Sequence, residues 1–158
     1  IHDVDYLYHV FGKVDSVYAV GKQEDSGCFN NVSTVMKFAC GVSAVVEGFM
    51  DTTGAFGFTT NVRINGSNAA AEMLNKSVYL EDGTRGKTNK LVFYPKNEPE
   101  QITEIERYNP YARETEYFAE CVQSGDETEM VPSEDVIQVL KILAAVKQSL
   151  ETGQVVYL

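Results

Sequence analysis

Apolar residues near the start of the chain recur at helical spacing. The side chains that follow the i, i+3, i+4, i+7 pattern of an amphipathic helix are Val4, Leu7, Tyr8 and Phe11. Gly12 comes directly after the last of them, and glycine is common just beyond a helix end. The pattern therefore predicts a short helix over Asp3–Phe11.

From Val14 to about Tyr94 the apolar period changes to two, which is the period of a β-strand. Val14–Gly21 is rich in β-branched residues and predicts a first strand. The next strand places on one face Val32, Thr34, Met36, Phe38 and Cys40. A turn at Gly41 leads to a third strand, whose shared face carries Val42, Ala44, Val46 and Met50. Together the second and third strands predict a hairpin.

A fourth strand has one apolar face and one polar face. Its apolar positions are Phe58, Thr60, Val62 and Ile64, and its polar positions are Thr59, Asn61, Arg63 and Asn65. Turn residues at Asn65-Gly66 and Asp82-Gly83 bracket two shorter strand candidates, Ala71–Leu74 and Ser77–Glu81, and Leu91–Tyr94 closes the run of strands. Strands joined by such short turns pair antiparallel, so we expect an antiparallel meander.

An acidic connector, Lys96–Arg107, separates these strands from a second predicted helix. Asn109 and Pro110 suit the N-cap and first helical positions of that helix, and Gly125 suits its end. Its apolar stripe consists of Tyr111, Thr115, Phe118 and Val122.

A third helix is predicted to begin at Ser133, which serves as its cap, and to end at Gly153. Val155–Leu158 is a final short strand. The fold class is therefore α+β, with an open, predominantly antiparallel sheet and helices packed on one face. We expect the other face to be free for substrate or for a second subunit, and residues 1–158 to form one domain.

Composition and charge exclude two classes of partner. Thirteen Lys and Arg residues against twenty-three Asp and Glu give a net charge of −10, opposite in sign to what a phosphate backbone attracts. No apolar run approaches the roughly 18 residues of a membrane helix. We therefore expect no nucleic acid and no membrane among the partners. The three cysteines lie too far apart for a disulfide framework or a CxxC metal pair, which predicts reduced thiols and a cytoplasmic protein.

The densest group of titratable side chains is His2-Asp3-Val4-Asp5, with His9 beyond it. Spacings of three and four residues bring His2, Asp5 and His9 near one helix face. An imidazole that titrates near neutrality can take the proton of a hydroxyl group as a hydride leaves the carbon, so His2 is a candidate acid/base. The structural alternative is an exposed terminal histidine with no chemical role.

A metal site is the other alternative for this segment, because Asp5 and His9 stand at i, i+4. The two histidines lie roughly 10 Å apart along a helix axis and do not share one ion. First-turn acids and a half-buried His9 explain the same residues, and we expect no metal. The chain has two closely spaced glycine pairs, Gly54 with Gly57 and Gly83 with Gly86, and neither belongs to a GxGxxG motif or precedes a predicted helix. We therefore expect this chain to bind no dinucleotide by itself.

The ordered set of short motifs along the chain resembles the C-terminal domain of the Gfo/Idh/MocA oxidoreductases, the glucose-fructose oxidoreductase and inositol dehydrogenase family. The opening match is Ile1-His2-Asp3-Val4-Asp5, Leu7, Phe11-Gly12 and Val14–Val20. The closing match is Phe118-Ala119-Glu120, Ser124-Gly125, Pro132-Ser133-Glu134-Asp135, Ala144-Ala145, Ser149 and Gly153-Gln154-Val155-Val156.

The resemblance implies that His2 is the catalytic histidine of a longer enzyme that oxidises or reduces a sugar, inositol or similar polyol. It also implies an N-terminal Rossmann domain that binds NAD or NADP and is missing from this chain. The chain opens at Ile1 without Met, and we expect it to be part of that longer polypeptide, inactive alone. The family's partner Asp and Lys fall before Ile1, so only His2 is carried over.

We further expect a homo-oligomer through the open sheet face that carries Thr59, Asn61 and Arg63. The alternative function is a non-enzymatic open-sheet module for binding or dimerisation.

Overall fold

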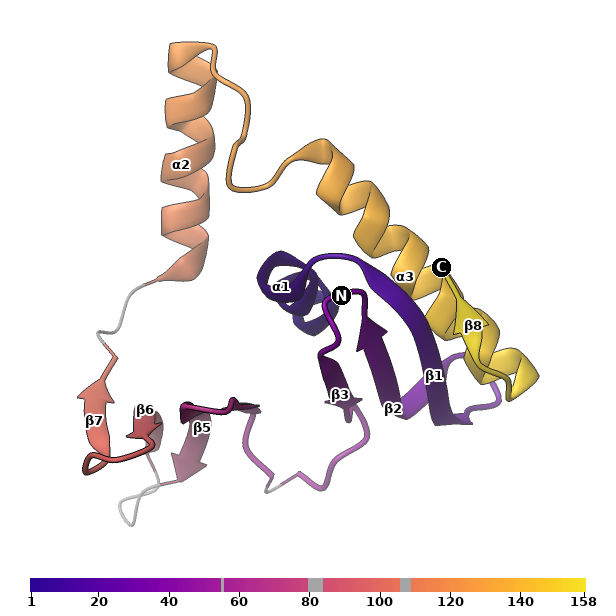
Figure 1. The fold of residues 1–158 in the computed structure, drawn as a ribbon, viewed down its shortest axis with the longest axis horizontal. Coiled ribbons are helices and arrows are strands. Elements are labelled where there is room, and N and C mark those ends of the chain that lie inside the picture. Colours follow the sequence, from indigo (N-terminus) through magenta and orange to yellow (C-terminus); the bar gives the residue numbers. More distant parts are fainter. Residues whose placement is uncertain (55, 80–83, 106–108) are drawn as a thin grey trace. The chain divides into compact units, whose positions relative to one another are not determined.

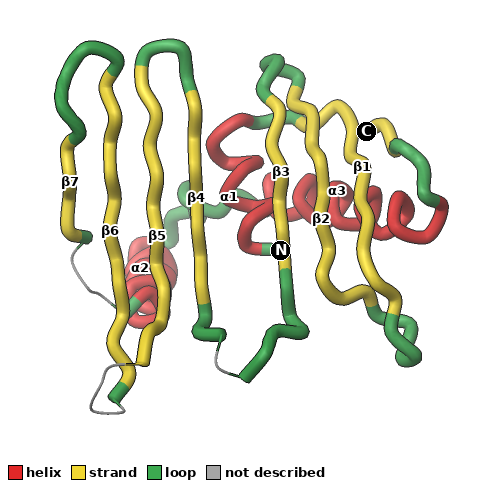
Figure 2. The backbone as a smooth tube through the Cα atoms, turned by 90° about the horizontal axis from the view of Figure 1, so that it is seen from below, coloured by secondary structure: helices red, strands yellow, loops and turns green. Residues whose placement is uncertain are grey.

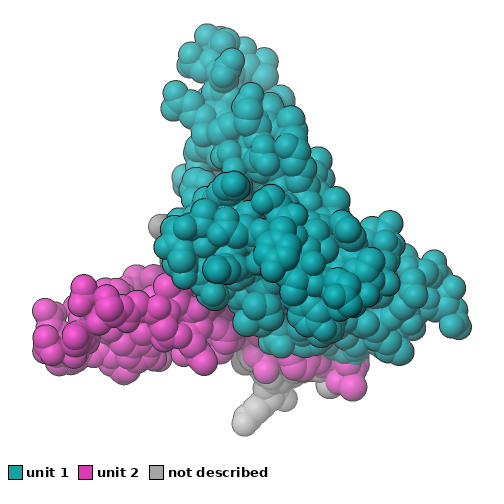
Figure 3. All heavy atoms as spheres, turned by 45° about the vertical axis from the view of Figure 1, so that its right-hand side comes forward, with its two compact units in different colours: residues 1–52, 113–158 teal, residues 53–112 magenta. Residues whose placement is uncertain are grey.

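The structure, a computed structural model, describes residues 1–54, 56–79, 84–105 and 109–158. The chain divides into two compact units (Figure 3). Unit 1 comprises Ile1–Thr52 and Arg113–Leu158, and unit 2 comprises Thr53–Ala112. The expected turn at Asp82-Gly83 lies outside the described residues.

Unit 1 contains a four-stranded sheet, sheet A, in the order β3-β2-β1-β8. Its strands are β1 (Val14–Gln23), β2 (Phe29–Phe38), β3 (Ser43–Gly48) and β8 (Val156–Tyr157), and every neighbouring pair is antiparallel. Its helices are α1 (His2–Phe11), α3 (Ser133–Thr152) and most of α2 (Pro110–Ser124). The predicted β2–β3 hairpin is confirmed.

Helices α1 and α3 cover one face of sheet A (Figures 1 and 2). The alternation of β1 and β2 turns every second side chain towards these helices. The residues that form the buried cluster are Val4 of α1, Val14, Val17 and Ala19 of β1, Met36 and Phe38 of β2, and Val139, Ile142, Ala145 and Val146 of α3. The predicted α+β class, with helices on one face of an open antiparallel sheet, is confirmed.

A buried hydroxyl group joins α3 to the sheet. Ser149 has 0 % exposure, and its Oγ accepts a 2.9 Å hydrogen bond from the Ala19 backbone N–H in β1. The same hydroxyl donates a 2.6 Å bond to the Gln154 carbonyl oxygen, just before β8. Strand β8 pairs with β1 only at Ser16 and Val17, so Ser149 takes the place of a strand neighbour further along the β1 edge.

Unit 2 contains sheet B, in the order β4-β5-β6-β7, again antiparallel throughout. Its strands are β4 (Thr59–Asn65), β5 (Ala69–Tyr79), β6 (Arg85–Pro95) and β7 (Gln101–Glu104). Their order along the chain confirms the predicted meander.

Strand boundaries in unit 2 differ from the sequence predictions. The two short candidates after Gly66 are one strand, β5, up to Tyr79, and β6 begins six residues before Leu91. Strand β7 lies inside the segment predicted as a connector. All four of its side chains are exposed, so no buried face requires apolar residues at every second position. Backbone pairing with β6 is what defines β7 as a strand.

The predicted caps of α2 and α3 have different outcomes. Asn109 Oδ1 accepts a 3.1 Å bond from the Tyr111 N–H, as expected of an N-cap. The prediction for Ser133 is wrong, because Pro132 occupies the N-cap with extended backbone angles and no side-chain cap bond. The φ of Pro132 is −61°, close to the value that the proline ring imposes. Pro132 can therefore lead the chain into α3, and Ser133 is the first helical residue. Gly153 ends α3 with a left-handed φ of 68°.

We predict that Ser149→Ala destabilises unit 1 by about 2–3 kcal/mol, because it leaves the buried Ala19 N–H and the Gln154 carbonyl without their partner. Chemical denaturation measures the change. Thr152→Ala is the matched control, since Thr152 Oγ1 makes an exposed bond to the Gln148 carbonyl on the same helix, and it should cost about 0.5 kcal/mol or less. Equal losses in the two variants would contradict the role given to Ser149.

Gly57 has no room for a side chain. A Cβ there would lie 2.0 Å from the Ser77 carbonyl oxygen of β5, where the Ser77 N–H also donates to the Phe58 carbonyl. We predict that Gly57→Ala destabilises unit 2 by about 2 kcal/mol or more and speeds amide exchange at Ser77. Gly54→Ala is the control, because its Cβ meets no atom within 4 Å. Unchanged exchange at Ser77 in Gly57→Ala would refute the prediction.

Candidate functional site

Helix α1 presents its titratable side chains on the face opposite the core. Val4 is buried in the cluster under sheet A, which fixes how α1 is turned about its axis. His2, Asp5 and His9 are all exposed, in agreement with their predicted placement near one face. The helix begins with a regular turn, in which the Asp5 N–H donates to the Ile1 carbonyl at 2.9 Å. His2 is therefore accessible for proton transfer with a molecule outside the chain.

Acidic residues flank His2 in the first turn of α1. Asp3 and Asp5 stand where the partial positive charge of the helix N-terminus favours carboxylates. Among the described residues, His, Cys, Asp and Glu nowhere gather in a group of three that could hold a metal ion.

A second polar cluster lies on sheet B, in unit 2. Arg63 of β4 and Glu72 of β5 face each other across the strands, and Arg63 Nη2 lies 2.8 Å from Glu72 Oε1. The hydrogen bond and charge of Arg63, with a smaller contribution from Asn61, lower the pKa of Glu72. Sequence reasoning named Asn61 and Arg63 but missed Glu72, because the pairing depends on strand register. The available signal was a basic residue before the Asn65-Gly66 turn and an acidic residue after it, on two strands that the turn predicts to be neighbours.

Sheet A leaves an apolar row on the face away from its helices. Tyr18 of β1 pairs with Val35 of β2, which pairs with Val45 of β3, and all three side chains are exposed. The sheet alternation turns these residues away from their buried neighbours. The expected open face thus exists in unit 1, and its central row is apolar. Thr59, Asn61 and Arg63 belong to the other unit.

The described chain contains no nucleotide cradle of the Rossmann type, because every strand pair in it is antiparallel and no strand leads through a glycine-rich turn into a helix that crosses to a parallel neighbour. The described helices also include none that is both long and apolar enough to cross a membrane.

Residues 1–158 match the family model described as "Oxidoreductase family, C-terminal alpha/beta domain". D-xylose 1-dehydrogenase (NADP(+)) 2 of Haloferax volcanii is 29% identical over 151 residues, which are 93% of this chain and 42% of that protein. The chain thus spans less than half of this curated relative.

Solved structures share the fold of this chain. The aldose-aldose oxidoreductase of Caulobacter crescentus, complexed with glycerol, has a TM-score of 0.76 at 16% identity, over 99% of this chain and 45% of that one. An Agrobacterium radiobacter oxidoreductase in complex with NAD⁺, L-tartaric acid and magnesium has a TM-score of 0.75 at 14% identity, over 99% and 46%. At such low identities the TM-scores show a likeness of fold alone.

We predict that the Glu72 carboxyl titrates below the range of an ordinary glutamate, and that Arg63→Gln moves its midpoint back upward. Since the folded pKa is lowered, the Arg63–Glu72 pair stabilises sheet B at neutral pH, and its contribution is lost as the pH falls through the pKa of the folded state. NMR titration of the carboxyl carbon gives the midpoint. A midpoint that Arg63→Gln leaves in place would show that the guanidinium is not the cause.

Proposed function

Because this chain is a C-terminal domain of the Gfo/Idh/MocA oxidoreductase family, we propose that the whole protein is an NAD(P)-dependent oxidoreductase of a sugar, inositol or similar polyol. The observation that carries the proposal is the exposed imidazole of His2 on the outer face of α1, at the position that resembles the family's catalytic histidine. The 158 residues alone are proposed to be inactive.

His2 is proposed to act as the general acid/base of this reaction. In the oxidation direction its imidazole would accept the proton of the substrate hydroxyl, and a nicotinamide held outside this chain would supply the hydride acceptor. In the reduction direction the imidazolium returns the proton to the carbonyl oxygen. An imidazole suits both directions because its ordinary pKa lies near neutral pH.

The cofactor is proposed to be held by a part of the protein outside this chain. A dinucleotide needs backbone N–H groups at a helix N-terminus after a parallel strand, and the described residues do not fit that requirement. More than half of the curated relative lies outside the part that this chain matches, and that length leaves room for an N-terminal Rossmann domain. Whether NAD or NADP is used would be decided there.

The substrate class rests on the relatives. Two of them are named for D-xylose and for aldoses, which are polyhydroxylated molecules with a carbon that carries either a hydroxyl or a carbonyl group. This is the chemistry that one acid/base histidine serves. We extend the class to this protein as a sugar, inositol or related polyol.

A homo-oligomer in the cytoplasm completes the proposal. Sheet A offers an exposed apolar row at Tyr18, Val35 and Val45, and β4 of sheet B offers polar side chains at Thr59, Asn61 and Arg63. Broad sheet faces of this kind are natural contact surfaces between identical subunits.

The same apolar row favours the second candidate function, a non-enzymatic module that uses its sheet to bind or dimerise. The two functions differ in their need for His2. The enzyme requires the imidazole for turnover, whereas the module's binding would tolerate its replacement.

We predict that His2→Asn in the full-length protein lowers kcat by about 10²–10⁴-fold, because the substrate hydroxyl loses its proton acceptor. Steady-state turnover of a panel of aldoses and inositols with NAD⁺ or NADP⁺ measures the loss. His9→Asn, which alters the same exposed face of α1, is the control and should retain kcat within about twofold. Full activity of His2→Asn would remove the assigned role, and absence of turnover in the unaltered protein would favour the module.

A further inference from the structure

A tyrosine lies between the two histidines on the outer face of α1. Val4 is buried in the cluster under sheet A, so the residues two positions before and after it, His2 and Tyr6, point to nearly the opposite side of the helix. His9 follows Tyr6 at a spacing of three, which places it in the same row. All three side chains are exposed. We call this row of His2, Tyr6 and His9 the α1 stripe.

The packing of α1 does not use the Tyr6 ring. The helix is anchored from its opposite side by Val4, Leu7, Tyr8 and Phe11, which contribute to the apolar cluster or pack against it. The ring centroid of Phe11 also lies 5.4 Å from that of Phe38 in β2, so this end of α1 is held on the sheet. Tyr6 itself stays 45 % exposed. A large aromatic side chain is therefore available to a ligand beside the candidate acid/base.

The spacing of Tyr6 from His2 suits a small ring-shaped ligand. Side chains at i and i+4 on a helix have Cβ atoms roughly 5–6 Å apart. Each face of a sugar or inositol ring consists of apolar C–H groups, whereas the hydroxyl groups lie around the rim. A tyrosine ring can cover such an apolar face, and with only two side-chain torsions it loses little conformational entropy in doing so. A ligand ring stacked on Tyr6 would therefore present a rim hydroxyl group to the imidazole of His2.

We propose that Tyr6 orients the substrate: its ring stacks on the C–H face of a cyclic sugar or polyol and brings one hydroxyl group to His2. This inference rests on the proposed function. It also narrows the substrate class, because a stacking residue selects a ring over an open-chain polyol, a choice that the imidazole alone does not make. Orientation of the hydroxyl group before proton transfer lowers the barrier to the reaction.

The rest of the outer face of α1 lies too far from His2 for the same role. His9 is seven residues from His2, roughly 10 Å along the helix axis, and Val10 is one residue further. Val10 is 44 % exposed and apolar, and it has no aromatic ring. A single ligand ring that contacts His2 therefore reaches Tyr6 within the α1 stripe and does not reach His9.

The test is steady-state kinetics of the full-length protein with D-xylose and myo-inositol, two ring-shaped compounds of the proposed class. Tyr6→Ala should raise KM about tenfold, because the substrate ring loses its stacking partner. Tyr6→Phe keeps the aromatic ring and should hold KM within about threefold of the unaltered protein. Val10→Ala, at an exposed apolar position of the same helix, is the matched control and should change KM by less than about twofold.

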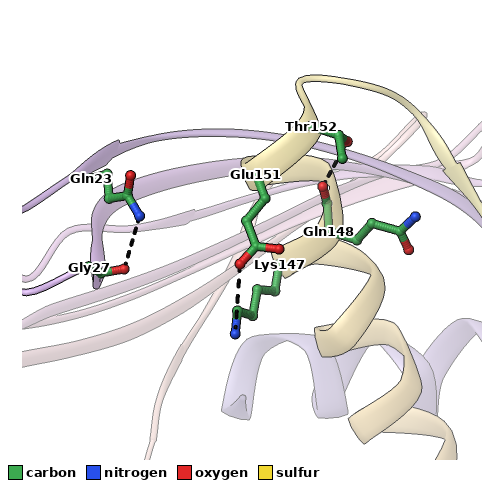
Figure 4. Close-up of polar contacts among 6 residues, drawn as sticks. All are labelled: Gln23, Gly27, Lys147, Gln148, Glu151 and Thr152. Carbon is green, nitrogen blue, oxygen red and sulfur yellow. Dashed lines mark hydrogen bonds and ion pairs between the residues drawn. The ribbon is translucent and has the colours of Figure 1, made fainter.

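Binding without turnover is measured by saturation-transfer NMR with the same two compounds, and Tyr6→Ala should weaken it about tenfold. Xylitol, which has no ring, should show no such difference. Amide exchange in α1 reports on folding and should be unchanged in Tyr6→Ala, since Tyr6 lies outside the buried cluster. Lys147→Gln on α3, where Lys147 lies 3.7 Å from Glu151 (Figure 4), is the control for a general effect of surface substitution.

Unchanged KM and binding in Tyr6→Ala, in a protein that turns over, would overturn the inference and leave the proposed function intact. A loss that Tyr6→Phe or xylitol shares would exclude stacking on a ring. Faster amide exchange in α1, with an equal loss in Val10→Ala, would make Tyr6 a structural residue and would also overturn the inference. Binding that depends on Tyr6 in a protein without turnover would support this site and reject the oxidoreductase function. Absence of both binding and turnover would reject both.

Discussion

The unpaired edge of β1 is the constraint on which unit 1 depends. Strand β8 pairs with only two residues of β1, so the backbone beyond them needs another partner inside the protein. The Ser149 hydroxyl group is this partner, because it accepts a hydrogen bond from the Ala19 N–H. The same hydroxyl group donates a hydrogen bond to the Gln154 carbonyl oxygen. One hydroxyl group therefore fixes the distance of α3 from the sheet and the path of the chain into β8.

The position of α3 in turn fixes α1 and the candidate acid/base. Val4 enters the cluster formed by α3 and the sheet, and this burial turns His2 outward. The residues that hold α1 in place are apolar and lie away from the chemistry. An apolar anchor on one side of the helix and an accessible imidazole on the other suit proton exchange with a molecule outside the chain.

The two sheets are stabilised by different interactions. Sheet A buries one face under helices, whereas sheet B is stabilised across its strands by pairs such as Arg63–Glu72 and by the close approach of Gly57 to Ser77. Exposed apolar residues remain on sheet A, α2 and α3. Exposed apolar side chains that gather in this way are typical of contact surfaces.

The amino-acid sequence by itself determined the helices, most of the strands, the antiparallel arrangement and the exposed face of α1 that carries His2. These features depend on residues close together in the chain, so periodicity, turn residues and the Asn109 cap reveal them. Only the tertiary structure decided the division into two sheets, the existence of strand β7, the Arg63–Glu72 ion pair and the two hydrogen bonds of the Ser149 hydroxyl group. Each of those depends on strand register or on contact between distant segments. Ser149 and Ala19 are 130 residues apart, and no local pattern encodes their meeting.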